Sequence, residues 1–303
     1  MKVKTVAGRY GQISYCDSDP VLGEALATYG EYFEGEVNIF RQYCREGDTV
    51  VDAGANVGAH TQALASIVGP KGRVIAIEPQ RPMFMLLCAN MIMNDYLQVE
   101  PHWAAVGAEN RRREYGRLDY DVPGGYMGYQ VDLLAACAMG LPNREFIETV
   151  TLDYLQCHKA TFMKVDVECQ EVNTIKGAAI SIEKARPVLY VENDKLEYSK
   201  DLIGLLRSLD YKLYWHMPLF FNPQNFAGST KRIPIHQEGI AFARGYHHVN
   251  GASMMLLCLP KGKELPVPQD VIEVGTDDEH PCHPEHWARL LPGFKLLRAA
   301  NAA

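Results

Sequence analysis

The stretch Val50-Val51-Asp52-Ala53-Gly54-Ala55-Asn56-Val57-Gly58 decides the fold class of this chain. The apolar residues before Asp52 predict a short buried strand, and residues 59–68 predict a helix that ends before Gly69-Pro70. Gly54 lets the backbone turn sharply and lets a ligand approach the main chain. A strand, a glycine turn and a helix in this order are typical of a nucleotide-binding α/β domain.

Strands and helices alternate along the chain on both sides of this stretch, which predicts a mostly parallel sheet covered on both faces. We expect a doubly wound, seven-stranded Rossmann-like α/β fold with a helical N-terminal lead-in and an insertion between the last two strands. The expected parts are a lead-in at 1–46, the Rossmann-like domain at 47–260 and a C-terminal tail at 261–303. The predicted strands cover residues 49–52, 73–78, 99–106, 161–166, 187–192, 211–216 and 253–259.

Composition excludes several classes of partner. The 303 residues carry a formal net charge of -7, so there is no global basic surface to hold phosphates, and we expect no nucleic-acid partner. No apolar run is long enough to cross a bilayer, and the first residues lack the apolar segment of a signal peptide. We therefore expect no membrane partner and a cytoplasmic location.

The residues around the glycine turn predict a nucleotide-like cofactor site. The helix start after the turn suits a carboxylate or phosphate, and Glu78, at the end of the next strand, suits ribose hydroxyls. Dinucleotide sites usually show GxGxxG, whereas this chain has GxxxG, so a ligand without a pyrophosphate fits better. The predicted cofactor-binding residues are Asp52, Gly54, Ala55, Asn56, Gly58, Glu78, Pro79, Ala104 and Asp166.

Three motifs together carry a family resemblance: residues 52–58, Ile77-Glu78-Pro79, and residues 164–168. From Tyr29 to Glu192 the chain resembles the FkbM family of methyltransferases. The resemblance implies S-adenosyl-L-methionine as cofactor and O-methylation of a hydroxyl on a small molecule or saccharide. One position departs from the family pattern, because Cys169 stands where the family usually has glycine.

The acidic ends of two predicted strands are candidates for catalysis, since ligands bind at the carboxyl ends of parallel strands. We predict Asp166, Glu168 and His216 as residues that position the acceptor or remove its proton. Glu168 and Glu171 have the alternative role of capping the following helix. Asp166 with Glu192 and Asn193 resembles the metal ligands of the catechol O-methyltransferase group, which implies Mg²⁺ as a further cofactor.

Alternative functions stay open at this stage. A nicotinamide-dependent oxidoreductase is disfavoured by the missing middle glycine, and a non-catalytic S-adenosylmethionine-binding module by the carboxylates of Asp166 and Glu168. The aromatic residues between 214 and 226 either stack on a ring substrate or pack in the core. We interpret Cys282 to His286 as a solvated turn rather than a zinc site, and His247-His248 as a loop pair.

Overall fold

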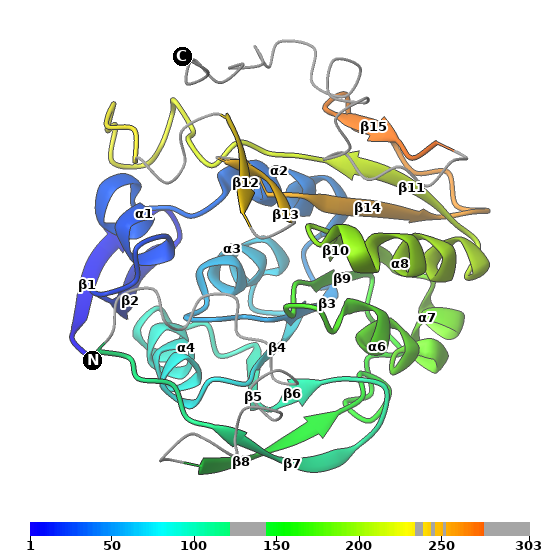
Figure 1. Cartoon of the computed structure of the whole chain (residues 1–303), viewed down its shortest axis with the longest axis horizontal. Coiled ribbons are helices and arrows are strands. Elements are labelled where there is room, and N and C mark those ends of the chain that lie inside the picture. Colours follow the sequence, from blue (N-terminus) through cyan, green and yellow to red (C-terminus); the bar gives the residue numbers. More distant parts are fainter. Residues whose placement is uncertain (122–143, 234–238, 244–245, 251–252, 276–303) are drawn as a thin grey trace.

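A computed structural model describes residues 1–121, 144–233, 239–243, 246–250 and 253–275. Its centre is an eight-stranded sheet of order β15-β11-β14-β10-β9-β3-β4-β5 (Figure 1). The strands span Thr49–Ala53 (β3), Arg73–Glu78 (β4), Val99–Trp103 (β5), Phe162–Val165 (β9), Val188–Glu192 (β10), Tyr211–His216 (β11), Met255–Pro260 (β14) and Val271–Glu273 (β15).

The sheet corrects the prediction of seven mostly parallel strands, because it has eight strands and is mixed. β3, β4, β5, β9 and β10 are parallel to one another, whereas β14 runs antiparallel between β10 and β11. β15 lies in the segment predicted to be a tail and pairs antiparallel with β11. The C-terminal segment therefore adds the outermost strand on that side of the sheet.

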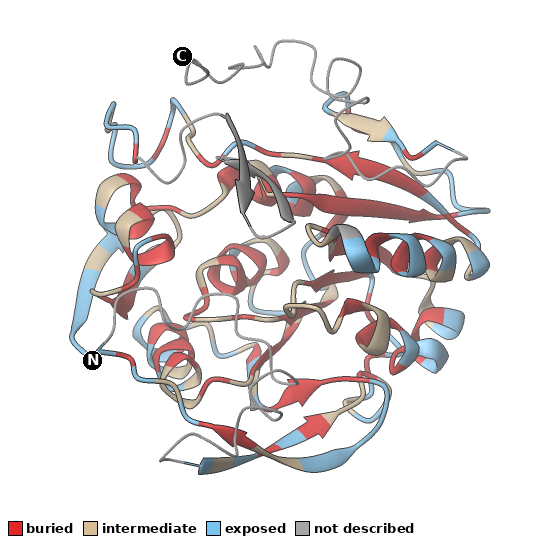
Figure 2. Cartoon of the chain, viewed as in Figure 1, coloured by how far each residue is buried: buried red, intermediate tan, exposed pale blue. Residues whose placement is uncertain are grey.

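Helices cover both faces of the sheet, and alternate strand residues explain why. Val50 and Val74 pack on one face with Glu34–Tyr43 (α2), Ala59–Val68 (α3) and Arg81–Met93 (α4). Val51 and Ile75 pack on the other face with Glu171–Lys176 (α6), Ala179–Ala185 (α7) and Leu196–Ser208 (α8). Figure 2 shows the central strands buried between these two layers, as expected of a parallel sheet covered on both faces.

The N-terminal lead-in is not wholly helical, which corrects the prediction. It begins with an antiparallel hairpin of Val3–Gly8 (β1) and Gly11–Cys16 (β2), followed by Leu22–Tyr29 (α1) and then α2. The Asn90 side chain on α4 holds the hairpin, since it accepts from Ser14 N at 2.7 Å and donates to Ser14 O at 2.9 Å. The lead-in is thereby attached to the Rossmann-like core.

Besides the β1–β2 hairpin, two further small sheets among the described residues lie outside the central one. Ala105–Val106 (β6), Arg111–Gly116 (β7) and Arg144–Val150 (β8) form a three-stranded sheet. The sequence predicted residues 105–106 as part of one strand over 99–106 and predicted no strand at β7 or β8. Gly239–Ala243 (β12) pairs with Tyr246–Asn250 (β13). His247 and His248 therefore lie in a strand and not in a loop, while Cys282 to His286 lie outside the described residues.

Among the residues that the structure describes, no helix combines the length and apolar character needed to cross a bilayer.

A buried carboxylate joins the lead-in to the insertion after β11. Glu31 is 6% exposed. Its Oε2 accepts from Arg9 Nε at 2.7 Å and from Phe226 N at 2.9 Å, and its Oε1 accepts from Asn222 Nδ2 at 2.8 Å. One side chain therefore accepts hydrogen bonds from three donors, one in the β1–β2 turn and two in the insertion after β11.

Replacing Glu31 with alanine should lower the free energy of unfolding by about 2–3 kcal/mol, because Arg9 and the Phe226 N–H would lose their acceptor. Urea unfolding followed by circular dichroism measures the change. Glu183→Ala, on the exposed face of α7, is the control and should stay within about 0.5 kcal/mol of wild type. Equal unfolding midpoints for Glu31→Ala and wild type would show that this carboxylate does not join the two segments.

Candidate cofactor-binding and active site

A cavity of about 240 Å³ lies at the carboxyl ends of β3, β4, β9 and β10. This is the edge at which ligands bind in open α/β sheets. Most of the residues predicted from the sequence line it: Gly54, Ala55, Asn56, Glu78, Pro79, Ala104, Asp166 and Glu168. The fold thus gathers residues from four separate chain segments around one cavity.

The turn after β3 passes very close to the chain that follows β9. Gly54 has a φ of +85°, and a Cβ at this position would lie 1.7 Å from the main-chain oxygen of Asp166. Gly54 N and Ala55 N both donate to Ile77 O at 3.0 Å. Glycine is therefore required here both by the left-handed backbone and by the approach of Asp166.

Glu78 shapes the same turn from the end of β4. Its Oε2 accepts from Asn56 N at 2.8 Å and its Oε1 from Gln80 N at 2.7 Å. Burial raises the pKa of the Glu78 carboxyl to about 7, although these hydrogen bonds oppose the change. Each oxygen keeps a second lone pair, so the side chain can hold the turn and still accept a hydrogen bond from a ligand.

Two predicted cofactor residues lie outside the cavity lining and contact the helices that pack against the turn. Asp52 is fully buried, and its Oδ2 accepts from the Thr61 hydroxyl on α3 at 2.6 Å. Gly58 faces Leu87 on α4, where a Cβ would meet the leucine side chain at 2.7 Å. Both residues position the cavity wall and do not form its surface.

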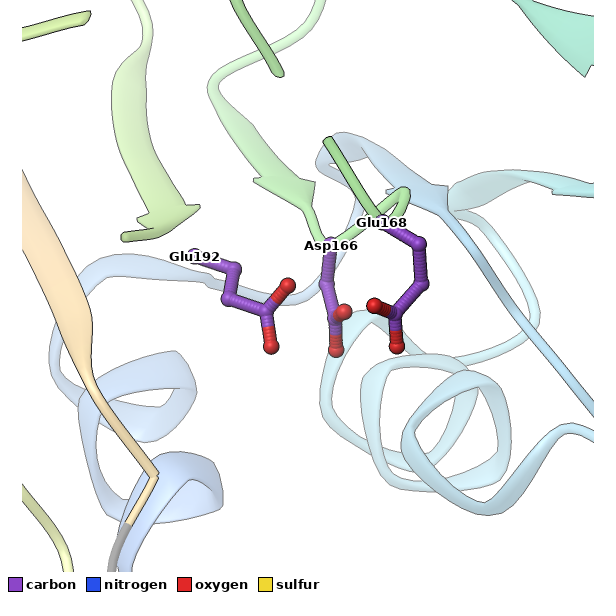
Figure 3. A group of neighbouring side chains, drawn as sticks. All are labelled: Asp166, Glu168 and Glu192. Atoms are coloured by element: carbon purple, nitrogen blue, oxygen red, sulfur yellow. The ribbon is translucent and has the colours of Figure 1, made fainter. Parts of the chain in front are cut away.

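Three acidic side chains converge at the ends of β9 and β10, and we call Asp166, Glu168 and Glu192 the carboxylate cluster (Figure 3). One oxygen from each lies within 4.8 Å of the others. Burial raises the pKa of the Glu168 carboxyl to about 7 and raises the pKa of the Glu192 carboxyl well above its ordinary value, with the neighbouring carboxylates adding to both effects. The cluster therefore concentrates negative charge and proton-binding capacity in one place.

A buried lysine balances part of this charge. Lys164 is 2% exposed, and its Nζ lies 3.2 Å from Asp166 Oδ2 and 3.5 Å from Asp52 Oδ1. Burial would lower the pKa of the Lys164 amine, but attraction by Asp166 and Asp52 outweighs burial and raises it. Lys195 pairs with Asp194 and lies 3.7 Å from Glu168 Oε2. Two of the three cluster carboxylates therefore have a cationic partner.

The backbone of the loop after the cluster explains why glycine is the usual residue of the family at position 169, where this chain has cysteine. Glu168 and Cys169 both have positive φ values, 51° and 68°. The backbone at 169 thus lies in the left-handed region that favours glycine. Glu171 is the first residue of α6, and its Oε1 accepts from Val167 N at 3.1 Å, so it stabilises this loop. The start of α6 has no side-chain capping hydrogen bond, so the alternative capping role is not found there.

Sequence reasoning missed several residues of the cavity wall. Leu22 and Tyr32 come from the lead-in, and His60 comes from the start of α3. Burial lowers the pKa of His60 to about 3, so its ring is neutral near pH 7. Tyr32 belongs to the aromatic and acidic segment 29–36, which is a sequence signal for this wall; nothing comparable marks Leu22.

His216 and Asn193 are placed differently from the other candidates. His216 is buried outside the cavity lining, with Nδ1 2.6 Å from the Tyr190 hydroxyl and Nε2 3.4 Å from Asp270 Oδ2. The Asn193 amide donates to Ser199 Oγ at 2.8 Å. The third member of the cluster beside Asp166 and Glu192 is therefore Glu168, and not Asn193 as the sequence suggested.

Tyr214, Trp215 and Phe220 are buried in the protein interior, whereas Phe226 is 49% exposed. Trp215 and Tyr214 belong to the two cores on either face of the sheet. The Phe220 ring contacts Tyr29 and Tyr32 edge to face, with centroids 6.0 and 5.7 Å apart. Phe220 therefore supports the wall that carries Tyr32.

Residues 52–213 match the family model described as the methyltransferase FkbM domain, which covers just over half of the 303 residues. The chain belongs to this family. The matched segment contains the glycine turn, Glu78 and the carboxylate cluster. It starts later and ends later than the resemblance seen in the sequence, and it leaves Leu22 and Tyr32 outside.

Several solved structures are similar to this chain at low sequence identity. The FkbM methyltransferase from Methylobacillus flagellatus KT is 17% identical, with a TM-score of 0.41, over 74% of this chain and 50% of that chain. The SAM-dependent O-methyltransferase TM0748 from Thermotoga maritima is 13% identical, with a TM-score of 0.42, over 77% and 66%. The chain thus spans half the length of the first of these proteins and about two thirds the length of the second.

A third structure, the O-methyltransferase TomG from Streptomyces achromogenes in complex with SAM, is 13% identical, with a TM-score of 0.39, over 75% of this chain and 80% of that chain. No curated protein matches the sequence.

Substituting Gly54 with alanine should destabilise this FkbM domain by about 3 kcal/mol or more, because the methyl group would meet the Asp166 carbonyl and the backbone is left-handed. Thermal unfolding measures the change. Gly204→Ala is the matched control: it lies in α8 with no atom within 4 Å of an added Cβ, and it should stabilise by about 0.5–1 kcal/mol. If both variants unfold at the wild-type temperature, the close approach at Gly54 is wrong.

Cys169→Gly should raise the free energy of unfolding by about 1 kcal/mol, since glycine adopts the left-handed backbone without the penalty of a side chain. Cys169→Ala removes the thiol but keeps the penalty, so it should not stabilise the protein. Chemical unfolding of the two variants beside wild type separates backbone strain from loss of the side chain. A glycine variant less stable than the alanine variant would contradict the left-handed conformation at this position.

Proposed function

We propose that this chain is an S-adenosylmethionine-dependent methyltransferase that methylates a hydroxyl group on a small molecule or saccharide. The observation that carries the proposal is the placement of Glu78 beside the Gly54–Asn56 turn, on the wall of a cavity built by the family segment. An enzyme of this kind needs to hold a nucleoside and expose an activated methyl group next to an acceptor.

The wall around Glu78 supports a nucleoside ligand. The carboxylate can accept from ribose hydroxyls while it holds the N–H groups of Asn56 and Gln80. Ala55 and Ala104 leave room for a ligand beside the main chain, and both line the cavity. The cofactor proposal therefore places the ribose at the end of β4 and the amino-acid portion toward the β3 turn.

The carboxylate cluster supports proton removal from the acceptor. In the proposed step the acceptor oxygen forms a bond with the methyl carbon, the carbon–sulfur bond breaks, and its electron pair returns to sulfur. The hydroxyl proton passes to a cluster carboxylate, and we assign Asp166 and Glu168 to this work and to acceptor positioning. We assign His216, which is buried against Tyr190, a structural role instead.

The part of the cavity wall beside the carboxylate cluster supports a small acceptor that is uncharged or cationic. Carboxylates face this part of the cavity together with Tyr32 and Leu22, and an anionic group there would be repelled. The exclusion of nucleic acid and of membranes, and the cytoplasmic location, stay predictions from the sequence.

Mg²⁺ also stays a prediction. The cluster offers three carboxylate oxygens within 4.8 Å of one another, and hard oxygen ligands are those that Mg²⁺ takes. However, Lys164 and Lys195 already lie beside Asp166 and Glu168, so a divalent ion would compete with both amines. When bound there, the ion would lower the pKa of an acceptor hydroxyl.

Isothermal titration calorimetry with S-adenosylmethionine tests the cofactor proposal directly. We expect saturable binding by wild type in the micromolar range and binding at least about tenfold weaker for Glu78→Gln, because the ribose loses a charged acceptor (about 1.4 kcal/mol). Glu264→Gln, at an exposed position, should bind as wild type does. The titrations are repeated with Mg²⁺ and with EDTA to test the metal.

Absence of binding by folded wild-type protein would refute the proposed function. Binding that Glu78→Gln leaves unchanged would keep the cofactor but remove Glu78 from its site. NADH is titrated in the same way. Saturable binding of NADH would support the alternative, a nicotinamide-dependent oxidoreductase.

A further inference from the structure

We propose that the outward side of α4 is the interface of a homodimer, in which two copies of this helix pack antiparallel about a twofold axis. This surface, which we call the α4 face, consists of Met85, Ala89, Ile92 and Met93 on the helix and Leu97 in the turn after it. None of these five residues lines the cofactor cavity. The proposal therefore goes beyond the proposed function and does not depend on it.

The helix α4 is apolar on its outward side as well as its inward side. No charged residue stands between Arg81 and Asp95. Met85 is exposed on the outward side, and the exposed fractions of Ile92 and Leu97 are 70% and 79%. The inward side packs in the core through Met83, Leu86, Leu87 and Met91. A helix that is apolar all round is normally covered on all sides, so the α4 face has the composition of a surface that binds a partner.

Two other helices at the surface have the usual charged outward side. Helix α7 exposes Glu183 and Lys184, and helix α8 exposes Glu197 and Lys200. Such side chains keep the outer side of a helix hydrated. The α4 face lacks them, so its apolar character is not a general property of the outer helices of this fold.

The charges at the two ends of α4 favour a second copy as the partner. Arg81 is the first residue of the helix, and Asp95 follows its last turn. Each charge lies at the end of its own helix where the dipole disfavours it, but would lie at the favourable end of an antiparallel copy. Arg81 contacts Glu145 at 3.0 Å through one nitrogen and stays partly exposed, so its other N–H groups can bind the partner.

The spacing along α4 also suits a twofold axis. Met85 and Ile92 lie seven residues apart, which is about two helical turns, so both occupy the same side. With the axis between Cys88 and Ala89, the Met85 side chain of each copy faces Ile92 of the other, as an isologous interface requires. Small side chains at the crossing point let the two helices approach closely. Arg81 then lies opposite the end of the partner helix.

Analytical ultracentrifugation of the full chain tests the proposal. One helix face is smaller than the surface of about 800 Å² per partner in a standard interface, so we expect a weak dimer with a Kd of about 10–100 μM. Between about 1 and 300 μM protein, the average mass should rise from that of one chain toward that of two.

Ile92→Glu should weaken dimerisation by at least about thirtyfold, because it places a charge in an apolar contact. Ile180→Glu, at an exposed position of α7, is the matched control and should dimerise as wild type does. Asp95→Asn should weaken the dimer by about threefold, as expected for an exposed ion pair. Circular dichroism confirms that each variant is folded.

Crosslinking tests the antiparallel arrangement. Cys88 is half-buried near the proposed axis, so a short bismaleimide should join the two Cys88 side chains, as mass spectrometry of the linked peptide would show. Cys88→Ser is the control and should lose this product. A dimer in which the Cys88 side chains do not crosslink would overturn the arrangement.

A wild-type protein that stays monomeric over the whole concentration range would overturn the proposal, as would unchanged dimerisation of folded Ile92→Glu. Cosedimentation with vesicles of phosphatidylcholine and phosphatidylserine tests the other apolar partner. Vesicle binding by a monomeric wild type, lost in Ile92→Glu, would assign the α4 face to a membrane instead. These measurements use no S-adenosylmethionine, so their outcome is independent of the proposed function.

Discussion

The pairing of one buried amine determines much of this structure. Lys164 lies opposite Asp52 in the parallel pairing of β9 with β3, and both side chains are almost completely buried. An unpaired charge at such a site would cost several kcal/mol, so a shift in strand register would be strongly disfavoured. Because Thr61 on α3 donates to Asp52 and Lys164 contacts Asp166, the same pairing orients the helix after the glycine turn and the first carboxylate of the cluster.

The sequence predicted the central strands and helices well, because their signals are local and strong. Buried parallel strands such as β4 are continuous apolar runs, and α3 ends at a glycine followed by proline. The strands β1, β7 and β8 were missed, since each has several exposed or half-buried residues and therefore a weak apolar pattern. β15 has three residues, too few to carry any periodicity.

The candidate site was predictable where one motif holds several residues. Gly54, Asn56 and Glu78 follow directly from strand ends, and the structure places all three on the cavity. Leu22 and Tyr32 could not be assigned, because only tertiary packing brings the lead-in to this wall. Asn193 was also misjudged: side chains alternate at the end of a strand, so Glu192 faces the cavity while Asn193 is directed toward Ser199.

The cavity draws its walls from two parts of the chain, one inside the family segment and one before it. The turn and the cluster lie inside the segment shared across the family, whereas Leu22 and Tyr32 lie before it. Substitutions in the lead-in can therefore reshape one wall without altering the turn or the strands that hold it. The shape of the cavity can thus be redesigned through the first part of the chain alone, with the glycine turn, Glu78 and the carboxylate cluster left unchanged.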